Sequence, residues 1–158
     1  MKQKKIKTIE GQLIVRGKEF AVIASRFNDF ITKRLLEACL AELKHRGVKE
    51  KEITVTWVSG SFEIPVTALK FARKKNIDAV ICLGAVIRGE TLHFELVANA
   101  ASQGIAQVSL LTGKPVIFGV LTTDTIDQAY KRSEIKGENK GRDVATTAIE
   151  MVSVMNQI

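Results

Sequence analysis

Four short apolar runs alternate along the chain with longer segments in which apolar residues recur every three or four positions. The runs are rich in β-branched residues, which is typical of strands buried on both faces of a parallel sheet. They span residues 19–25, 53–59, 78–87 and 115–123. The segments with helical spacing span residues 30–45, 63–75, 94–110 and 141–156. Strand and helix in alternation predict βαβ units, whose right-handed crossovers place helices on both faces of one sheet.

One further apolar stretch, "IEGQLIV" at residues 9–15, precedes these units and is predicted to form an additional short strand. It has no place in the predicted sheet, so a neighbouring subunit could supply its pairing partner. The sequence shows no internal repeat, no low-complexity segment and no sign of a second domain. We therefore predict one domain over residues 1–158, with residues 1–8 as a flexible basic tail.

Length and composition are those of an ordinary globular protein. The 158 residues suffice to bury one sizeable core, and 46% hydrophobic and 26% charged residues are typical values. No apolar run approaches the roughly 20 residues that cross a bilayer, and the N-terminus lacks the apolar core of a signal peptide. The expectation is a cytoplasmic protein without membrane contact. Cys39 and Cys82 stand in apolar surroundings, so we expect neither a disulfide nor a metal site.

The net charge of +7 raises the question of nucleic-acid binding. Four of the lysines fall within residues 2–7, outside the predicted sheet. A single tryptophan and a single tyrosine, Trp57 and Tyr130, do not make the stacking platform that single-strand binders use. Small anionic ligands explain the charge at least as well, and no specific nucleic-acid partner is expected.

Polar, small or aromatic residues follow each of the four predicted strands. These endings read "SRFN" at 25–28, "SGSFE" at 59–63, "GAVIRGETLH" at 84–93 and "TTDT" at 122–125. In open parallel sheets the carboxyl ends of the strands lie at one edge, where ligands bind. The sequence therefore predicts a ligand site at this edge.

The ending "RGETLH" combines a glycine turn with a histidine at the start of a helix. Gly89 permits close backbone approach, and the amides of Glu90 and Thr91 precede a helix, where unpaired donors bind anions. A helix N-terminus disfavours the imidazolium form of His93, whereas a bound phosphate favours it, so His93 is a candidate for proton transfer. An ordinary capped turn with a first-turn histidine is the alternative. His45, at a predicted helix C-terminus, is assigned no function.

The other endings each allow two interpretations. Phe27 could stack on a planar heterocycle or enter the next helix as a hydrophobic staple. The turn at Gly60 and Ser61 exposes amides, and Glu63 could cap the helix, accept from a ligand N–H group, or do both. Basic residues between 127 and 143 could neutralise a phosphate or form a solvated face. They are Lys131, Arg132, Lys136 and Lys140.

With these segments in view, the sequence closely resembles the lumazine synthase family over nearly its whole length. The resemblance is carried, in family order, by "SRFN", "GSFEIP", "GAVIRGETLHFE", "FGVLTTDTIDQA" and "NKG". It implies an α/β fold, a flavodoxin-like three-layer α/β/α sandwich with a central four-stranded parallel sheet. It also implies pentamers, which in some members assemble into an icosahedral capsid, with active sites between adjacent subunits. The additional N-terminal strand would then join a neighbour's sheet.

The resemblance implies a condensation of 5-amino-6-(D-ribitylamino)uracil with 3,4-dihydroxy-2-butanone 4-phosphate, with no metal or redox cofactor. His93 would transfer protons. Contacts with the pyrimidine and its ribityl chain are implied for Phe27, Asn28, Ser61, Phe62, Glu63, Val86 and Ile87. Contacts with the phosphate are implied for Gly89, Glu90, Thr91 and Arg132. Lys140 would be a further ligand contact, and Phe118 an aromatic donated across the subunit interface.

Three positions depart from the family pattern. Ser59 stands where proline usually precedes the glycine of "GSFE", Glu134 where glycine is usual, and Asp143 where glutamate is usual. An acid near Arg132 could weaken phosphate binding unless Lys136 pairs with it. A non-catalytic shell protein that binds flavin or lumazine in the same fold is the rival hypothesis to the enzyme.

Overall fold

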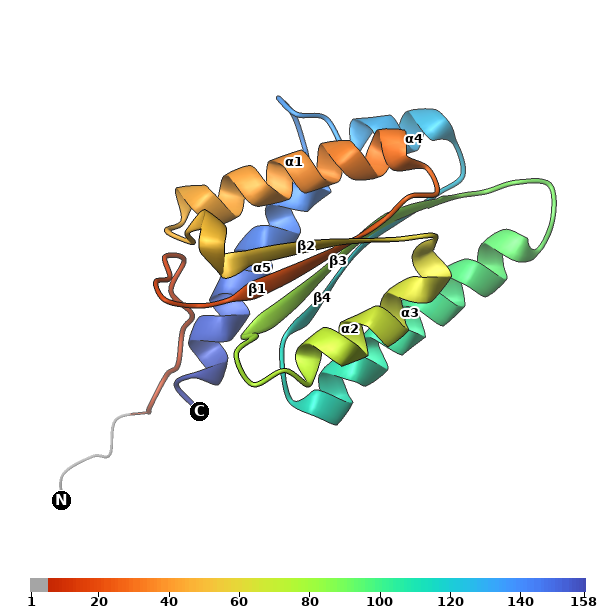
Figure 1. Ribbon diagram of the computed structural model, residues 1–158. Helices are drawn as coiled ribbons and strands as arrows, with labels where there is room; N and C mark the ends of the chain where they lie inside the picture. Colours follow the sequence, from red (N-terminus) through yellow and green to blue (C-terminus); the bar gives the residue numbers. More distant parts are fainter. Residues whose placement is uncertain (1–5) are drawn as a thin grey trace, which may run out of the picture.

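The computed structural model describes residues 6–158 and shows a four-stranded parallel sheet between two layers of helices (Figure 1). The strand order is β2-β1-β3-β4. The strands are β1 Phe20–Ser25, β2 Ile53–Val58, β3 Ala79–Ile87 and β4 Val116–Thr123. The helices are α1 Asp29–His45, α2 Ile64–Ala72, α3 His93–Thr112, α4 Ile126–Lys131 and α5 Lys140–Met155. The predicted α/β class with a parallel sheet is confirmed.

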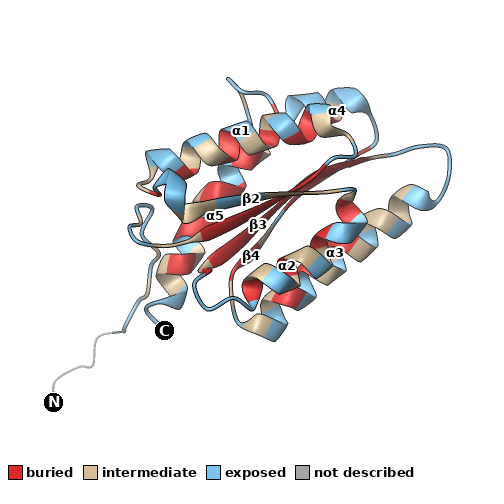
Figure 2. Cartoon of the chain, in the orientation of Figure 1, coloured by how far each residue is buried: buried red, intermediate tan, exposed pale blue. Residues whose placement is uncertain are grey.

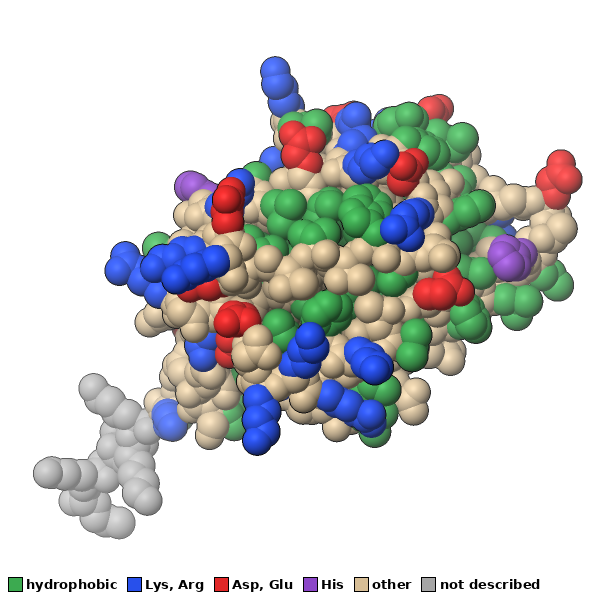
Figure 3. All heavy atoms as spheres, in the orientation of Figure 1, with side chains coloured by type: hydrophobic (Ala, Val, Ile, Leu, Met, Phe, Trp, Pro, Cys, Tyr) green, Lys and Arg blue, Asp and Glu red, His purple; other side chains and the backbone are tan. Residues whose placement is uncertain are grey.

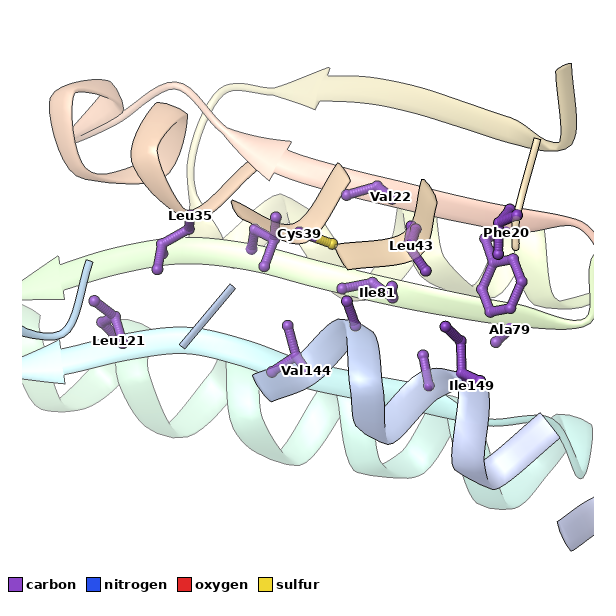
Figure 4. Close-up of a cluster of buried hydrophobic side chains, with 14 of the residues drawn as sticks. Phe20, Val22, Leu35, Cys39, Leu43, Ala79, Ile81, Leu121, Val144 and Ile149 are labelled. Atoms are coloured by element: carbon purple, nitrogen blue, oxygen red, sulfur yellow. The ribbon is translucent and has the colours of Figure 1, made fainter. Parts of the chain in front are cut away.

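Alternate residues of the central strands point to opposite faces of the sheet, and each face has its own core. Phe20 and Val22 of β1 pack with α1 and α5, as Figure 4 shows for that cluster. Ala21 and Ile23 pack in the second cluster, with buried residues of α2 and α3. Because β1 and β3 are covered on both sides, they carry the continuous apolar runs seen in the sequence, and Figure 2 shows them buried.

Strands β2 and β4 are the two edges of the sheet, and β2 is the less buried of them. It pairs with β1 alone, and none of its residues is buried. Val55, for example, is 38% exposed. The expectation of a strand buried on both faces is therefore wrong for β2 in the single chain. Helices α3, α4 and α5 pack on β4, whereas β2 packs mainly on β1, so its faces stay partly exposed.

The predicted additional strand at residues 9–15 is not confirmed. A strand requires a ladder of backbone partners, and this segment instead makes separate contacts with two helices. The amide of Gln12 donates to Ser153 Oγ at 2.9 Å in α5, and that of Val15 donates to the Arg46 carbonyl at 3.1 Å, just after α1. Pairing with a neighbouring subunit stays a prediction. The predicted basic tail falls mostly on residues 1–5, outside the described residues.

Two smaller expectations concern the cysteines and the helices. Cys39 and Cys82 are both buried free thiols, as expected of small apolar residues, and burial raises the pKa of Cys39 to about 12. Within residues 6–158, none of the helices combines the length and the apolar character needed to cross a bilayer. Helix α4 was not predicted, because its six residues are too few to show a helical period.

Candidate ligand cleft

A cleft of about 770 Å³ opens at the carboxyl edge of the sheet. Its walls come from the residues after β1, the turn between β2 and α2, the end of β3 and the first turn of α3. The lining residues are Phe27, Ser59, Gly60, Ser61, Phe62, Glu63, Ala85, Val86, Ile87, Gly89, Thr91, His93, Phe94, Leu96 and Val97. Three of the four strand endings that were predicted to form one site thus line this cleft, whereas residues 122–125 after β4 do not.

Phe27 stands at the rim of this cleft because the pairing of β1 with β2 continues past the strand ends. The amide of Arg26 donates to the Val58 carbonyl at 2.8 Å and that of Phe27 to the Ser59 carbonyl at 3.0 Å. The Phe27 side chain remains 73% exposed, far more than a ring packed on α1 as a hydrophobic staple would be. Asn28 follows in the left-handed conformation, with φ 61°, and its Nδ2 donates to the Ala85 carbonyl at 2.8 Å. Asn28 is absent from the lining and ties this turn to β3.

The turn between β2 and α2 forms a second wall. Ser61 is 5% exposed, whereas Phe62 beside it is 60% exposed and offers its ring to the cleft. A Cβ atom on Gly84 would lie 2.7 Å from Ser25 Oγ and 2.8 Å from Ser61 Oγ. Only glycine at position 84 therefore lets the two serine hydroxyls approach the backbone of β3 this closely.

The loop after β3 supplies backbone donors. Within residues 6–158, the backbone N–H groups of residues 89–92 donate no hydrogen bond to a backbone or side-chain acceptor. Gly89 has no atom within 4 Å of the place where a Cβ would stand, so a ligand can approach its backbone. His93 is the first residue of α3, and its amide donates to Thr91 Oγ1 at 3.4 Å. Glu90 is exposed and does not line the cleft.

Arg132 and Lys140 do not line this cleft, but the structure brings them to each other. The amide of Lys140 donates to the Arg132 carbonyl at 2.9 Å, and an antiparallel bridge joins Ser133 to Asn139. Lys140 Nζ lies 3.0 Å from Asp143 Oδ2, and this hydrogen bond raises the pKa of Lys140. Asp143 therefore reaches the lysine despite being shorter than glutamate.

Glu134 was expected to weaken phosphate binding by Arg132 unless Lys136 paired with it. Within residues 6–158, Glu134 makes no ion pair with Arg132 or with Lys136. Its backbone carbonyl accepts from the Gly137 amide at 3.3 Å, and its carboxylate lies over Gly137, where a Cβ would stand 2.6 Å from Oε2. Glu134 thus closes its own loop, and its effect on phosphate binding stays a prediction.

Phe118 lies outside the cleft as well. It is 42% exposed on β4 and lines a second hollow of about 470 Å³, together with Arg88, Phe94 and Asp124. Phe94 separates this hollow from the cleft, since it lines both of them. A ligand role for Phe118 thus requires a site other than the cleft of its own chain.

Sequence reasoning missed the apolar wall made by Phe94, Leu96 and Val97, and it missed Arg88. The wall had a signal, because residues 93, 96 and 97 are spaced to share one face of a helix. Arg88 gave no such signal in the sequence, because its role depends on side-chain contacts with residues 94, 95 and 124, which only the fold shows.

Comparison with known proteins gives one family match. A family model described as 6,7-dimethyl-8-ribityllumazine synthase matches residues 17–156. The matched range begins before β1 and ends after α5, so it contains every strand and helix described above and every candidate site residue.

Proposed function

The chain belongs to the 6,7-dimethyl-8-ribityllumazine synthase family of transferases, which act in riboflavin biosynthesis, and we propose which substrates it takes and which residues hold them. The substrates are 5-amino-6-(D-ribitylamino)uracil and 3,4-dihydroxy-2-butanone 4-phosphate. They condense to 6,7-dimethyl-8-ribityllumazine, with release of phosphate and water. The observation that carries the proposal is the cleft itself, in which an exposed aromatic ring, a row of unpaired amides and a histidine meet.

Phe27 and Phe62 suit the pyrimidine. Both rings are more than half exposed at the cleft, and a planar heterocycle that stacks on one of them removes apolar area from water. The carboxylate of Glu63 and the polar groups of Ser61 line the same wall and can accept or donate hydrogen bonds to the ring and the ribityl chain. Backbone groups of Val86 and Ile87 complete the floor.

The loop at residues 89–92 suits the phosphate of the second substrate. Its unpaired amides precede a helix of 20 residues, whose N-terminal dipole favours an anion. Arg132 and Lys140 add positive charge after β4, at the same edge of the sheet. We assign Arg132 to the phosphate and Lys140 to a further ligand contact.

The protein contributes mainly by positioning. The pyrimidine amine is itself the nucleophile and forms an imine with the ketone, after which a proton is removed and the phosphate departs. Holding two substrates in reactive geometry corresponds to effective concentrations of roughly 10⁵–10⁸ M. His93, exposed at the cleft beside the amide loop, carries the protons. The overall reaction is not an oxidation or reduction and therefore needs no redox cofactor, and no metal is assigned to it.

The proposal includes a homo-oligomer, a pentamer that in turn could form an icosahedral capsid. Leu92, Leu96, Leu110 and Leu111 on and beside α3 are each at least 67% exposed. Figure 3 shows further apolar side chains exposed on the viewed face, around the open edge at β2. These surfaces support contact with a second copy, and the open edge of β2 could receive the segment at 9–15 of a neighbour. Light scattering of the purified protein measures the assembly.

The deciding experiment is incubation of the purified protein with both substrates while lumazine fluorescence and released phosphate are recorded. We expect both signals to rise together. His93→Gln should slow them, whereas His45→Gln, at the last residue of α1 and outside the cleft, is the matched control and should not. A protein that binds the pyrimidine but forms no product would support the rival, a flavin- or lumazine-binding shell protein.

A further inference from the structure

Arg88 joins three segments at the place where β3 leaves the sheet. Its Nε donates to Asp124 Oδ1 at 2.7 Å, just beyond β4, and its Nη1 pairs with Glu95 in the first turn of α3. Its guanidinium carbon lies 4.4 Å from the centre of the Phe94 ring. The Arg88 amide donates to the Thr123 carbonyl at 2.9 Å, so backbone and side chain hold the same strand end.

The loop that follows Arg88 has little else to hold it. Residues 89–92 are exposed, and the contact within the loop is the 3.4 Å hydrogen bond from the His93 amide to Thr91. Arg88 fixes the beginning of this loop, and through Phe94 and Glu95 it also fixes the first turn of the helix at its end. The position of the unpaired amides therefore depends on Arg88.

The same contacts continue into α4 and reach Arg132, which does not line the cleft of its own chain. The amide of Asp124 donates to Gln128 Oε1 at 2.9 Å, inside α4. The carbonyl of Gln128 in turn accepts from Arg132 Nη1 at 3.2 Å. A continuous series of hydrogen bonds thus runs from Arg88 through Asp124 and Gln128 to Arg132.

The charge of Arg88 is already compensated by two carboxylates. The hydrogen bonds that Arg88 donates to Asp124 and then to Glu95 raise the pKa of Arg88. Glu95 Oε2 is enclosed and has no hydrogen-bond partner within residues 6–158, and the hydrogen bond from Arg88 is the largest cause that lowers the pKa of Glu95. An arginine held between two acids is suited to fixing the segments around it.

We propose that Arg88 is a positioning residue that holds the amide loop at 89–92 in a fixed position between the ends of β3 and β4 and the first turn of α3. This inference rests on the proposed function and deepens it. The residue acts through the backbone amides of the loop, and it does not itself contact the phosphate.

The test uses Arg88→Gln and Asp124→Asn, with affinity for inorganic phosphate and the KM of each substrate as readouts. Removal of Arg88 should weaken phosphate binding roughly two- to thirtyfold, the range seen for residues that act through a network. The KM of the phosphorylated ketone should rise by a similar factor, while the KM of the pyrimidine stays unchanged. Arg88→Lys should not rescue the loss, because an ammonium cannot make the same fork of contacts.

Asp124→Asn separates positioning from simple attraction. This change removes a negative charge near the site, so attraction alone predicts tighter phosphate binding, whereas positioning predicts weaker binding, as in Arg88→Gln. Tighter binding in Asp124→Asn together with weaker binding in Arg88→Gln would overturn the inference, because Arg88 would then act as a direct charge. Unchanged phosphate binding in both variants would also overturn it.

A matched control is Arg73→Gln, which removes the same charge at the C-terminal cap of α2. Because α2 starts at the cleft and runs back along the sheet, Arg73 lies at the opposite edge, and phosphate affinity should not change. Circular dichroism establishes that each variant is folded. Wild-type protein that forms no lumazine would refute the proposed function, whereas active wild type with unaffected variants would refute the role of Arg88 alone.

Discussion

Gly141 in the "NKG" segment is the position where a single methyl group should do the most damage to the packing of α1 and α5. The residue is buried in the first turn of α5, and a Cβ atom there would lie 2.0 Å from the Leu35 carbonyl oxygen and 2.7 Å from the Leu35 carbonyl carbon. Both atoms belong to the backbone inside α1, so they cannot rotate away. Carbon contacts are comfortable near 3.5 Å, and Gly141→Ala must therefore separate the helices by about 1.5 Å.

Two opposing terms set the size of the effect. Overpacking of this kind costs about 1–3 kcal/mol and sometimes more, and a clash against backbone belongs at the upper end. Alanine in place of glycine inside a helix returns about 1 kcal/mol of helix propensity. The net loss of unfolding free energy is therefore about 2 kcal/mol, which corresponds to a fall in Tm of roughly 4–8 °C for a domain of this size.

Differential scanning calorimetry on wild type and variants, at equal protein concentration because assembly shifts Tm, measures this change. Gly89→Ala is the control, since no atom lies within 4 Å of its Cβ position and its backbone is outside the left-handed region. Its Tm should not change. Gly141→Ala should also weaken ligand binding, because Lys140, the proposed further ligand contact, precedes the displaced residue. A Tm equal to or above that of the wild type would show that the spacing of α1 and α5 is not fixed by Gly141.

Three further predictions concern the site. His93→Ala should lower the single-turnover rate roughly 10- to 10⁴-fold without abolishing it, and an unchanged rate would exclude the histidine from the mechanism. Arg132→Ala should weaken binding of the phosphorylated substrate by roughly 1.5–3 kcal/mol, and calorimetric titration that found only the pyrimidine affected would contradict the assignment. A hydrogen bond from Arg88 lowers the pKa of Glu95 below its ordinary 4.5, so this pair stabilises the fold above pH 4.5 and the contribution fades as the pH falls through the lowered pKa. The difference in urea midpoint between wild type and Arg88→Gln should therefore shrink between pH 7 and pH 3, and a constant difference would refute the linkage.

The strands could be predicted from the sequence because β1 and β3 are covered on both faces, which leaves an unbroken apolar run as their signature. For β2 the prediction of burial on both faces was wrong. Thr54 and Thr56 alternate there with apolar residues, which is the pattern of a half-buried strand, and its side chains are partly or fully exposed. The strand predicted at 9–15 is not confirmed for a different reason. Its expected pairing partner belongs to a neighbouring subunit, so a single chain cannot show that pairing.

The site could be predicted as far as topology determines it. Parallel strands deliver their carboxyl ends to one edge, so Phe27, Ser61 and His93 meet in the cleft although their positions are far apart in sequence. Topology does not reveal which side chains connect those ends. Arg88 follows an apolar strand and resembles any exposed basic residue, and only the folded chain shows that two acids and an aromatic ring surround it.

Phe118 shows how the register of the sheet limits what one chain can do. It pairs with Cys82 in the middle of β3, whereas the β3 residues that line the cleft, Ala85 to Ile87, pair with residues 121–123. Strands rise about 3.3 Å per residue, so an offset of three to five residues places the ring roughly 10–17 Å back along the sheet from the cleft level. No rotamer of a phenylalanine spans that distance. If Phe118 contacts the ligand, as the family resemblance implies, the ligand must be the one bound by a neighbouring copy, and a complete site then needs two chains.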